Sequence, residues 1–168
     1  MNYLIAVVYN GVLHIKGVIM NIGELCNRET VIVLKDENIV EVARLMRHYH
    51  VGDLIVVTKS GDDNIPIGIV TDRDIVMEVV ANYADPQTVK VVEIMSQELL
   101  TGSEEDGIHE IIERMRMHGI RRLPIVGKEG CLAGIISVDD ILEFLGEEVD
   151  ALIGLFYKER RSETDKMG

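Results

Sequence analysis

The chain contains an internal repeat, and this repeat restricts its fold more than any other feature. The stretch Gly68–Ile75 returns as Gly134–Ile141, with the same order of glycine, apolar, hydroxyl and acidic residues. Ile22–Cys26 similarly resembles Val91–Met95. The first copy is longer only in the turn at 60–64, where a repeat can absorb extra length without disturbing its core. The sequence therefore predicts two duplicated units that pack on each other as one body.

The two copies predict the same series of elements. Apolar residues recur at helical spacing over 37–49 and 104–118, with Asp36 and Ser103 as expected N-caps. Gly52 and Gly119 are expected near the ends of these helices. The remaining elements are strands at 54–58, 66–70, 123–126 and 131–136 and helices at 72–82 and 138–146. The expected fold class is α/β, with two β-α-β-β-α units.

Composition limits the function classes. Of the 168 residues 47% are hydrophobic but only 4% are aromatic, which predicts an aliphatic core. The net charge of −12 disfavours binding to nucleic acid, which needs a cationic surface. Cys26 and Cys131 lie far apart, lack metal-ligand spacing and are expected to be small buried residues. These features predict a cytoplasmic protein with no metal site and no membrane segment.

The two ends of the chain allow alternatives. Asn10-Gly11 between apolar runs favours a hairpin of 4–9 with 12–19, packed on the edge of the body. The alternative is an extension, 1–20, with little order. After Gly146, an apolar stripe in 142–156 favours a helix that lies on the body or on a second subunit, followed by a charged, frayed tail from Lys158. The expected divisions are therefore 1–20, 21–86, 87–146 and 147–168.

The hydroxyl and acidic residues of the repeat indicate either a helix cap or a ligand contact. Thr71 precedes Asp74, and Ser137 precedes Asp140, each by three positions at a predicted helix start. This spacing is typical of helix capping. It also places a hydroxyl beside free backbone N–H groups at the helix start, where it could contact an anion. The aspartate lies one turn later on the same face, where its two oxygens could accept hydrogen bonds from both hydroxyls of a ribose. The two roles are compatible.

The paired G-h-h-[T/S]-x-x-D stretches (h, hydrophobic), each following an amphipathic helix and a strand such as Arg122–Val126, resemble a tandem cystathionine-β-synthase-type (CBS) domain pair, or Bateman module. The resemblance covers about Ile22 to Gly146. It implies two pseudo-symmetric units packed sheet to sheet, with clefts between them for adenosine-containing ligands. It also implies frequent homodimers in the form of a flat four-domain disc.

The resemblance further implies two sets of nucleotide-binding residues. Residues before each middle strand would contact the base and the phosphate. One set is Ser137, Asp140, Ile120, Arg121, Arg122 and Ile135, and the other is Thr71, Asp74, Val51, Gly52, Asp53 and Ile69. The arginines favour phosphate in the first set, whereas Asp53 would repel phosphate in the second. The alternative for Arg121-Arg122 is a solvated surface pair.

The function expected from these features is that of a regulatory sensor. The module would bind AMP, ADP, ATP, NAD or S-adenosylmethionine, require no cofactor and modulate a partner protein. The alternative is a structural dimerisation module with empty clefts. Asp72, Asp74, Asp139 and Asp140 could suggest a metal or acid/base site, but neighbouring residues at a helix start point in different directions. No catalytic motif is present, so an enzyme is not expected.

Overall fold

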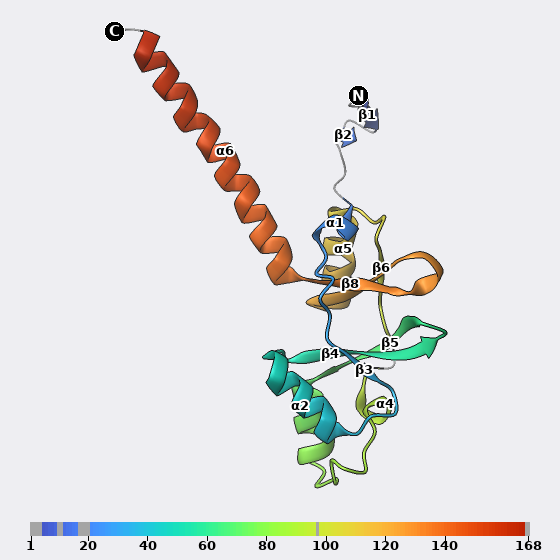
Figure 1. Ribbon diagram of the computed structural model, residues 1–168. Helices are drawn as coiled ribbons and strands as arrows, with labels where there is room; N and C mark the ends of the chain where they lie inside the picture. The colour runs from blue at the N-terminus through green and yellow to red at the C-terminus, as the bar shows by residue number, and fades with distance from the viewer. Residues whose placement is uncertain (1–4, 10–11, 17–20, 97, 167–168) are drawn as a thin grey trace.

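The computed structural model describes residues 5–9, 12–16, 21–96 and 98–166 (Figure 1), with side chains described for 21–96 and 98–154. The body contains two three-stranded sheets with the same strand order. The first sheet consists of β3 (Ile32–Leu34), β4 (Asp53–Ser60) and β5 (Asp63–Thr71). The second consists of β6 (Gly102–Ser103), β7 (Arg122–Val126) and β8 (Leu132–Ser137).

Strand pairing is duplicated along with strand order. In each sheet the first strand is parallel to the middle strand, and the middle strand is antiparallel to the last. Both hairpins have a register shift at the equivalent place, between Val56 and Val57 and between Ile125 and Val126. The sheets face each other, and β5 contacts β8 between them (Figure 1). The predicted α/β fold of two sheet-to-sheet units is confirmed.

One longer helix covers the outer face of each sheet. These helices are α2 (Ile39–Tyr49) and α5 (Ile108–His118), and both end at a left-handed residue, His50 or Gly119. The expected C-terminal role of Gly52 was wrong, because His50 ends the first helix. The buried residues of α2 and α5 recur at helical spacing, as the sequence predicted, and are Ile39, Val42, Met46, Ile111 and Met115.

Both predicted N-caps were wrong. The α2 cap is Asn38, whose side-chain oxygen accepts a hydrogen bond from the Glu41 N–H at 3.1 Å. Asp36 lies in the preceding turn. Ser103 ends β6, and its N–H donates to Asp106 Oδ2 at 3.0 Å, so this pair closes the turn before α5. The two first strands, β3 and β6, had not been located because they are only three and two residues long.

Two short helices are exchanged between the units. Helix α1 (Ile22–Leu25) begins the first repeat, but Ile22 and Cys26 are buried in the second core beside α5 and β8. Helix α4 (Val91–Ile94) begins the second repeat, yet Val91 is buried in the first core. The Ile22 N–H donates to Asp106 O and the Val91 N–H to Glu37 O, each at 2.9 Å. The two cores therefore do not coincide with the two sequence repeats.

This exchange explains the glycine at the start of each repeated stretch. After α1 the chain crosses β8, where Asn27 and Ile135 exchange backbone hydrogen bonds of 2.8 and 2.9 Å. A Cβ atom on Gly134 would lie 2.6 Å from the Asn27 carbonyl oxygen. A Cβ atom on Gly68 would lie 2.5 Å from Met95 Sδ and 2.8 Å from Ser96 O. Glycine allows the exchanged segment to approach the strand this closely.

The last helices of the two units differ. In the first unit, α3 (Asp72–Asp74) continues as a π-helix, η1 (Ile75–Val80), in which the Ala81 N–H donates to Val76 O at 2.9 Å. In the second unit, α6 runs uninterrupted over Val138–Lys166 and extends away from both sheets (Figure 1). The expected end of this helix at Gly146 and the frayed tail from Lys158 were therefore wrong, and of the two alternatives for the stripe, packing on the body is not observed.

The remaining elements lie at the N-terminus and in the second hairpin. β1 (Ile5–Tyr9) pairs antiparallel with β2 (Val12–Lys16) in a separate two-stranded sheet, so it does not extend the edge of the body. The expected turn at Asn10-Gly11 lies outside the described residues. A short 3₁₀ helix, η2 (Lys128–Gly130), connects β7 to β8. Within the part of the chain that the structure describes, no helix is both long enough and apolar enough to cross a membrane.

Candidate functional site

The candidate site is a cleft of about 270 Å³ between the two units. The first unit and the segment leading into it contribute residues near β3 and the start of β4, whereas the second contributes the start of β7, the end of β8 and the start of α6. The lining residues are Asn27, Glu29, Thr30, Val31, His50, Val51, Gly52, Asp53, Ile55, Arg122, Ile135, Ser137 and Asp140. Aliphatic walls thus stand beside carboxylates, one guanidinium and backbone groups, which suits a flat ligand with a polar substituent.

Ser137 and Asp140 form a compact hydrogen-bonded cap at the start of α6. The Ser137 hydroxyl and N–H donate to Asp140 Oδ2 at 2.5 and 2.7 Å, and the Asp140 N–H donates back to Ser137 Oγ at 3.1 Å. The capping interpretation is therefore correct. Among the described residues, none donates a hydrogen bond to Asp140 Oδ1. One oxygen, not both as expected, is left to accept from a ligand.

Thr71 and Asp74 form the same cap in the first unit. Asp74 Oδ2 accepts hydrogen bonds from the Thr71 hydroxyl at 2.7 Å and from the Thr71 N–H at 2.8 Å. These residues do not line the cleft that contains Ser137. Ile69 also lies elsewhere, where its N–H donates to Ser96 Oγ at 3.2 Å. The duplicated motif thus places its two copies at different positions on the body.

An ion pair joins the units inside the cleft. Arg122 Nε lies 3.0 Å from Asp53 Oδ1, and the two side chains are 47% and 10% exposed. Burial raises the pKa of the Asp53 carboxyl above its ordinary value, the Arg122 guanidinium partly lowers this pKa, and Asp72 raises it. A phosphate that enters the cleft would therefore compete with a largely buried carboxylate for the guanidinium of Arg122.

The predicted grouping of the site residues needs correction. Strand pairing agrees with the two predicted sets, because Asp53 pairs with Thr71 in the first sheet and Arg122 pairs with Ser137 in the second. The cleft nevertheless combines the unit-2 residues with Val51, Gly52 and Asp53 of unit 1, which had been assigned to the other site. The reason is that the sheets face each other, so a cleft at their junction draws from both units.

Two further predicted site residues, Ile120 and Arg121, lie outside this cleft in the structure. Ile120 and Arg121 line a separate groove between α5 and α6. Arg121 lies 3.5 Å from Asp139, and both side chains are mostly exposed, so the solvated alternative describes Arg121 and not Arg122. Sequence reasoning missed Asn27, Glu29, Thr30, Val31, His50 and Ile55. The glycine at 134 was the available signal, because it indicated that another segment crosses β8.

The cysteines show no special chemistry. Both are free thiols; Cys26 is buried, whereas Cys131 is partly exposed, contrary to expectation. Desolvation raises the pKa of both thiols above the ordinary value, which disfavours the reactive thiolate. Among the described residues, no group of three His, Cys, Asp or Glu side chains is arranged to hold a metal ion.

Two duplicated units, packed sheet to sheet around a cleft bounded by a Ser-x-x-Asp cap, define a tandem module of two α/β repeats. The family model for the CBS domain matches residues 22–81 and 91–147, more than half of the chain. The chain belongs to the CBS-domain family and is a CBS pair.

The chain is similar to several proteins over most of its length. An uncharacterized protein of Methanopyrus kandleri is 37% identical over 124 residues, which make up 74% of this chain and 62% of that protein. A CBS domain protein from Pyrobaculum aerophilum, solved as a complex with AMP, is 29% identical with a TM-score of 0.63, covering 71% of this chain and 88% of that one. A hexameric CBS-CP12 protein from bloom-forming cyanobacteria is 32% identical with a TM-score of 0.64, covering 75% and 68%.

Proposed function

We propose that this protein is a regulatory module that binds an adenosine-containing ligand in the cleft between its units and modulates a partner protein. The ligand class comprises AMP, ADP, ATP, NAD and S-adenosylmethionine. The observation that carries the proposal is the juxtaposition of Asp140, Arg122 and aliphatic walls in one cleft. A relative of similar fold forms a complex with AMP, which supports this class of ligand.

The cleft suggests a role for each of its parts. Asp140 Oδ1 would accept a hydrogen bond from a ribose hydroxyl, a charge-assisted contact worth about 1.5–3 kcal/mol. Micromolar affinity requires about 8 kcal/mol, so burial of the base against Val31, Val51 and Ile135 must provide much of the remainder. Arg122 would bind a phosphate once Asp53 shares or releases it.

Regulation would follow from the position of the ligand between the units. A ligand shifts a partner only if it binds two arrangements of the module with different affinity. The cleft residues belong to both units, so occupancy would favour one spacing of the two sheets. The free thiols are compatible with a reducing cytoplasm, and the proposed activity is binding without turnover.

AMP binding to matched cap variants tests the proposal. Isothermal titration calorimetry should show at least a tenfold loss of AMP affinity for Asp140→Ala, because that variant lacks the ribose acceptor. Asp74→Ala removes the same cap from the twin motif outside the cleft and should retain affinity in this cleft. Equal losses in both variants would contradict the assignment of the site.

A thermal-shift screen with AMP, ADP, ATP, NAD and S-adenosylmethionine tests the wider ligand class. A ligand at one hundred times its Kd should stabilise the protein by about 2.7 kcal/mol. If no ligand near millimolar concentration raises the melting temperature, the structural dimerisation module with empty clefts becomes the better account of the protein.

A further inference from the structure

The cleft between the units carries more negative than positive groups. Its charged lining residues are three carboxylates and one guanidinium, those of Glu29, Asp53, Asp140 and Arg122. Asp53 lies 3.0 Å from Arg122, so its carboxylate balances the guanidinium. Among the described residues, neither Glu29 nor Asp140 forms an ion pair. The cleft therefore has an excess of negative charge, although the sequence predicted a phosphate site at this place.

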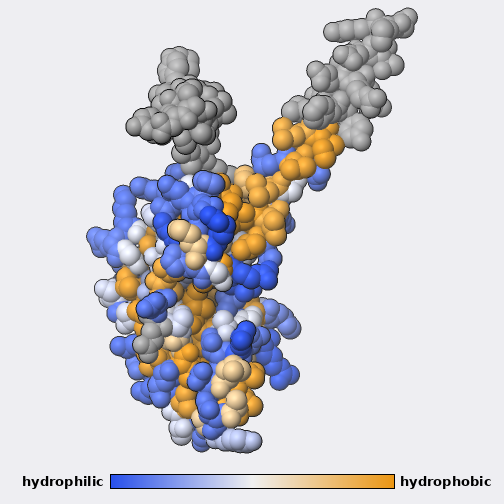
Figure 2. All heavy atoms as spheres, turned by 180° about the vertical axis from the view of Figure 1, so that it is seen from behind, coloured by the Kyte–Doolittle hydropathy of each residue, from blue (hydrophilic) through white to orange (hydrophobic). Residues whose placement is uncertain are grey.

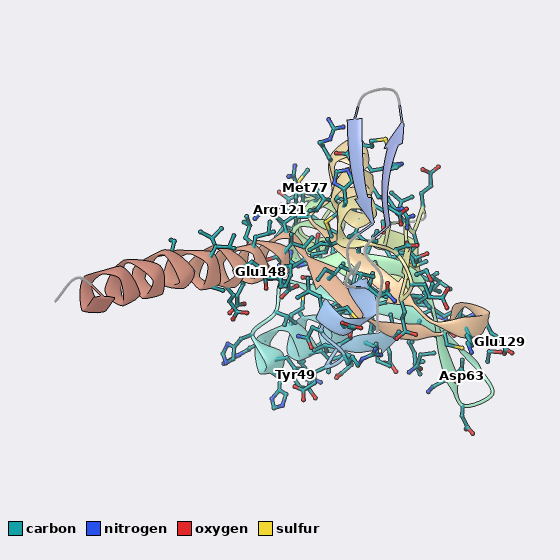
Figure 3. The ribbon with its side chains drawn as sticks, turned by 90° about the horizontal axis from the view of Figure 1, so that it is seen from above. Tyr49, Asp63, Met77, Arg121, Glu129 and Glu148 are labelled. Carbon is teal, nitrogen blue, oxygen red and sulfur yellow. The ribbon has the colours of Figure 1, made fainter. Side chains whose placement is uncertain are left out.

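The neighbouring cations do not offset this excess. Arg28 lies 2.8 Å from Glu104, and Arg121 lies 3.5 Å from Asp139. Neither arginine lines the cleft, and Figure 3 shows Arg121 beside the root of α6. The imidazole of His50 does line the cleft, but at pH 7 it adds little positive charge. A ligand in the cleft thus faces unpaired carboxylates with no matching cation close to them.

The start of α6 does not offset the charge either. A helix N-terminus attracts anions through its free N–H groups. Here the Asp140 carboxylate already accepts a hydrogen bond from the Ser137 N–H at 2.7 Å, so an anion of the protein occupies part of that position. In the first unit, a Cβ atom on Gly52 would lie 3.4 Å from Asp72 Oδ2, which places a further carboxylate beside the cleft wall. A phosphate would therefore meet carboxylates from both units.

We propose that the charge of this cleft selects its ligand, so that an adenosyl compound with a cationic 5′ substituent binds more tightly than adenosine, and each added phosphate weakens binding. Glu29 is the residue that determines this specificity, because it is exposed at the cleft and its N–H, not its carboxylate, is engaged with Asn27 Oδ1 at 2.8 Å. This inference rests on the proposed function, because an adenosyl ligand must first enter the cleft.

The charge of the whole chain acts in the same direction. The net charge is −12, and hydrophilic residues cover much of the body in Figure 2. A summed field of this sign lowers the local concentration of anionic ligands and raises that of cationic ones. The unpaired carboxylates of the cleft add a short-range preference of the same sign, which a substitution within the cleft can isolate.

Ligands that differ only at the 5′ position test the proposal. 5′-Amino-5′-deoxyadenosine carries a positive charge, adenosine carries none, AMP carries about two negative charges, and ATP carries more. Calorimetry near pH 7, without divalent cations and in about 0.05 M NaCl, should show affinity falling in this order by roughly threefold or more at each step. In about 1 M NaCl the steps should shrink, which a purely steric preference would not show. Affinity that rises with phosphate number, or steps that salt leaves unchanged, would overturn the proposal.

Two variants locate the selecting charge. Glu29→Gln should lower the ratio of amine to AMP affinity about tenfold, because it removes one unpaired carboxylate from the cleft. Glu129→Gln is the matched control, since it removes the same charge from an exposed residue of η2, which Figure 3 shows at a hairpin tip away from α6. The ratio should stay unchanged in this control. An unchanged ratio in Glu29→Gln, or an equal fall in both variants, would overturn the role of Glu29.

Failure of this inference differs from failure of the proposed function. If adenosine binds and Asp140→Ala abolishes that binding, but affinity does not follow the charge at the 5′ position, the selectivity is wrong and the adenosyl site stands. If no member of the series binds, both the site and its selectivity are wrong.

Discussion

Asp53 and Arg122 occupy equivalent positions in the two units, at the start of the middle strand, yet they carry opposite charges. In a symmetric duplication, identical residues at this place would face each other across the junction, and like charges would repel. Here the difference produces an ion pair of 3.0 Å that joins the units. The two copies therefore have different roles. Their divergence at the position of Asp53 and Arg122 provides an ion pair between the units and determines which charges line the cleft.

The glycines of the repeated stretches should give the largest effects. Gly134→Ala should destabilise the protein by about 1–3 kcal/mol, because the new methyl group would lie 2.6 Å from the backbone oxygen of Asn27. Gly68→Ala should cost somewhat less, since the flexible side chain of Met95 can move and the nearest backbone atom, Ser96 O, would lie 2.8 Å from the new methyl group. Urea denaturation measures both. Gly146→Ala, which meets no atom within 4 Å in a helix, is the control and should stabilise by about 0.5–1 kcal/mol.

Exchanging the charges of the ion pair tests whether the two units depend on it. Arg122→Asp should cost about 1–2 kcal/mol of unfolding free energy, because it leaves Asp53 facing a second carboxylate while Arg122 itself is half-exposed. The double variant Asp53→Arg with Arg122→Asp should recover most of this loss. Strictly additive effects in urea denaturation would show that the two positions are not coupled.

Removing the negative charge of Asp53 should raise the affinity of the cleft for a ligand that carries a phosphate. In Asp53→Asn the Arg122 guanidinium no longer has a carboxylate partner, so AMP affinity should rise about tenfold, or 1.4 kcal/mol. Adenosine, which has no phosphate, is the control ligand and its affinity should change little. Calorimetry with both ligands measures the difference, and a parallel gain for adenosine would contradict this role of Asp53.

The smallest expected effect concerns pH. Because burial raises the folded-state pKa of Asp53, the unfolded chain loses this proton first as pH rises. The contribution of Asp53 to the free energy of unfolding is therefore fully present below the ordinary pKa of an aspartate, near 4. This contribution declines as pH rises through the higher pKa of the folded state. The stability of Asp53→Asn relative to wild type should therefore increase from pH 4 to 7. A difference that falls over this range would contradict the raised pKa.

The repeat predicted the fold because the longer helices and strands leave local signals, whereas β3 and β6 are too short to do so. The helical spacing of Ile39, Val42 and Met46 identified α2, and the repeated stretches from Gly68 and Gly134 identified a strand followed by a helix in each unit. Local signals could not show which unit α1 and α4 would join, since that choice depends on packing between distant residues. They also failed at Asp53, whose side chain reaches across the junction to the other unit.

The C-terminal helix shows the same limit. The stripe from Leu142 to Leu152 was visible in the sequence, but a stripe identifies a helix with one apolar face and does not identify its neighbour. Gly146 was read as the end of the helix because glycine commonly follows a helix C-terminus. In α6 the chain continues through it, with good helix formers on both sides.

The exchange of α1 has a consequence for synthesis of the chain. Residues Asn27 and Arg28 bond to β8, and Arg28 reaches the Ala133 carbonyl oxygen at 3.4 Å across 105 residues of sequence. During translation, residues 22–28 cannot make these contacts until β8 has left the ribosome. The second core can therefore form only when most of the chain has been synthesised. Closure over such a separation slows folding, and completion of the second core requires residues from both repeats. A nascent chain stopped after the first repeat would expose Ile22 and Cys26, apolar residues that chaperones can bind.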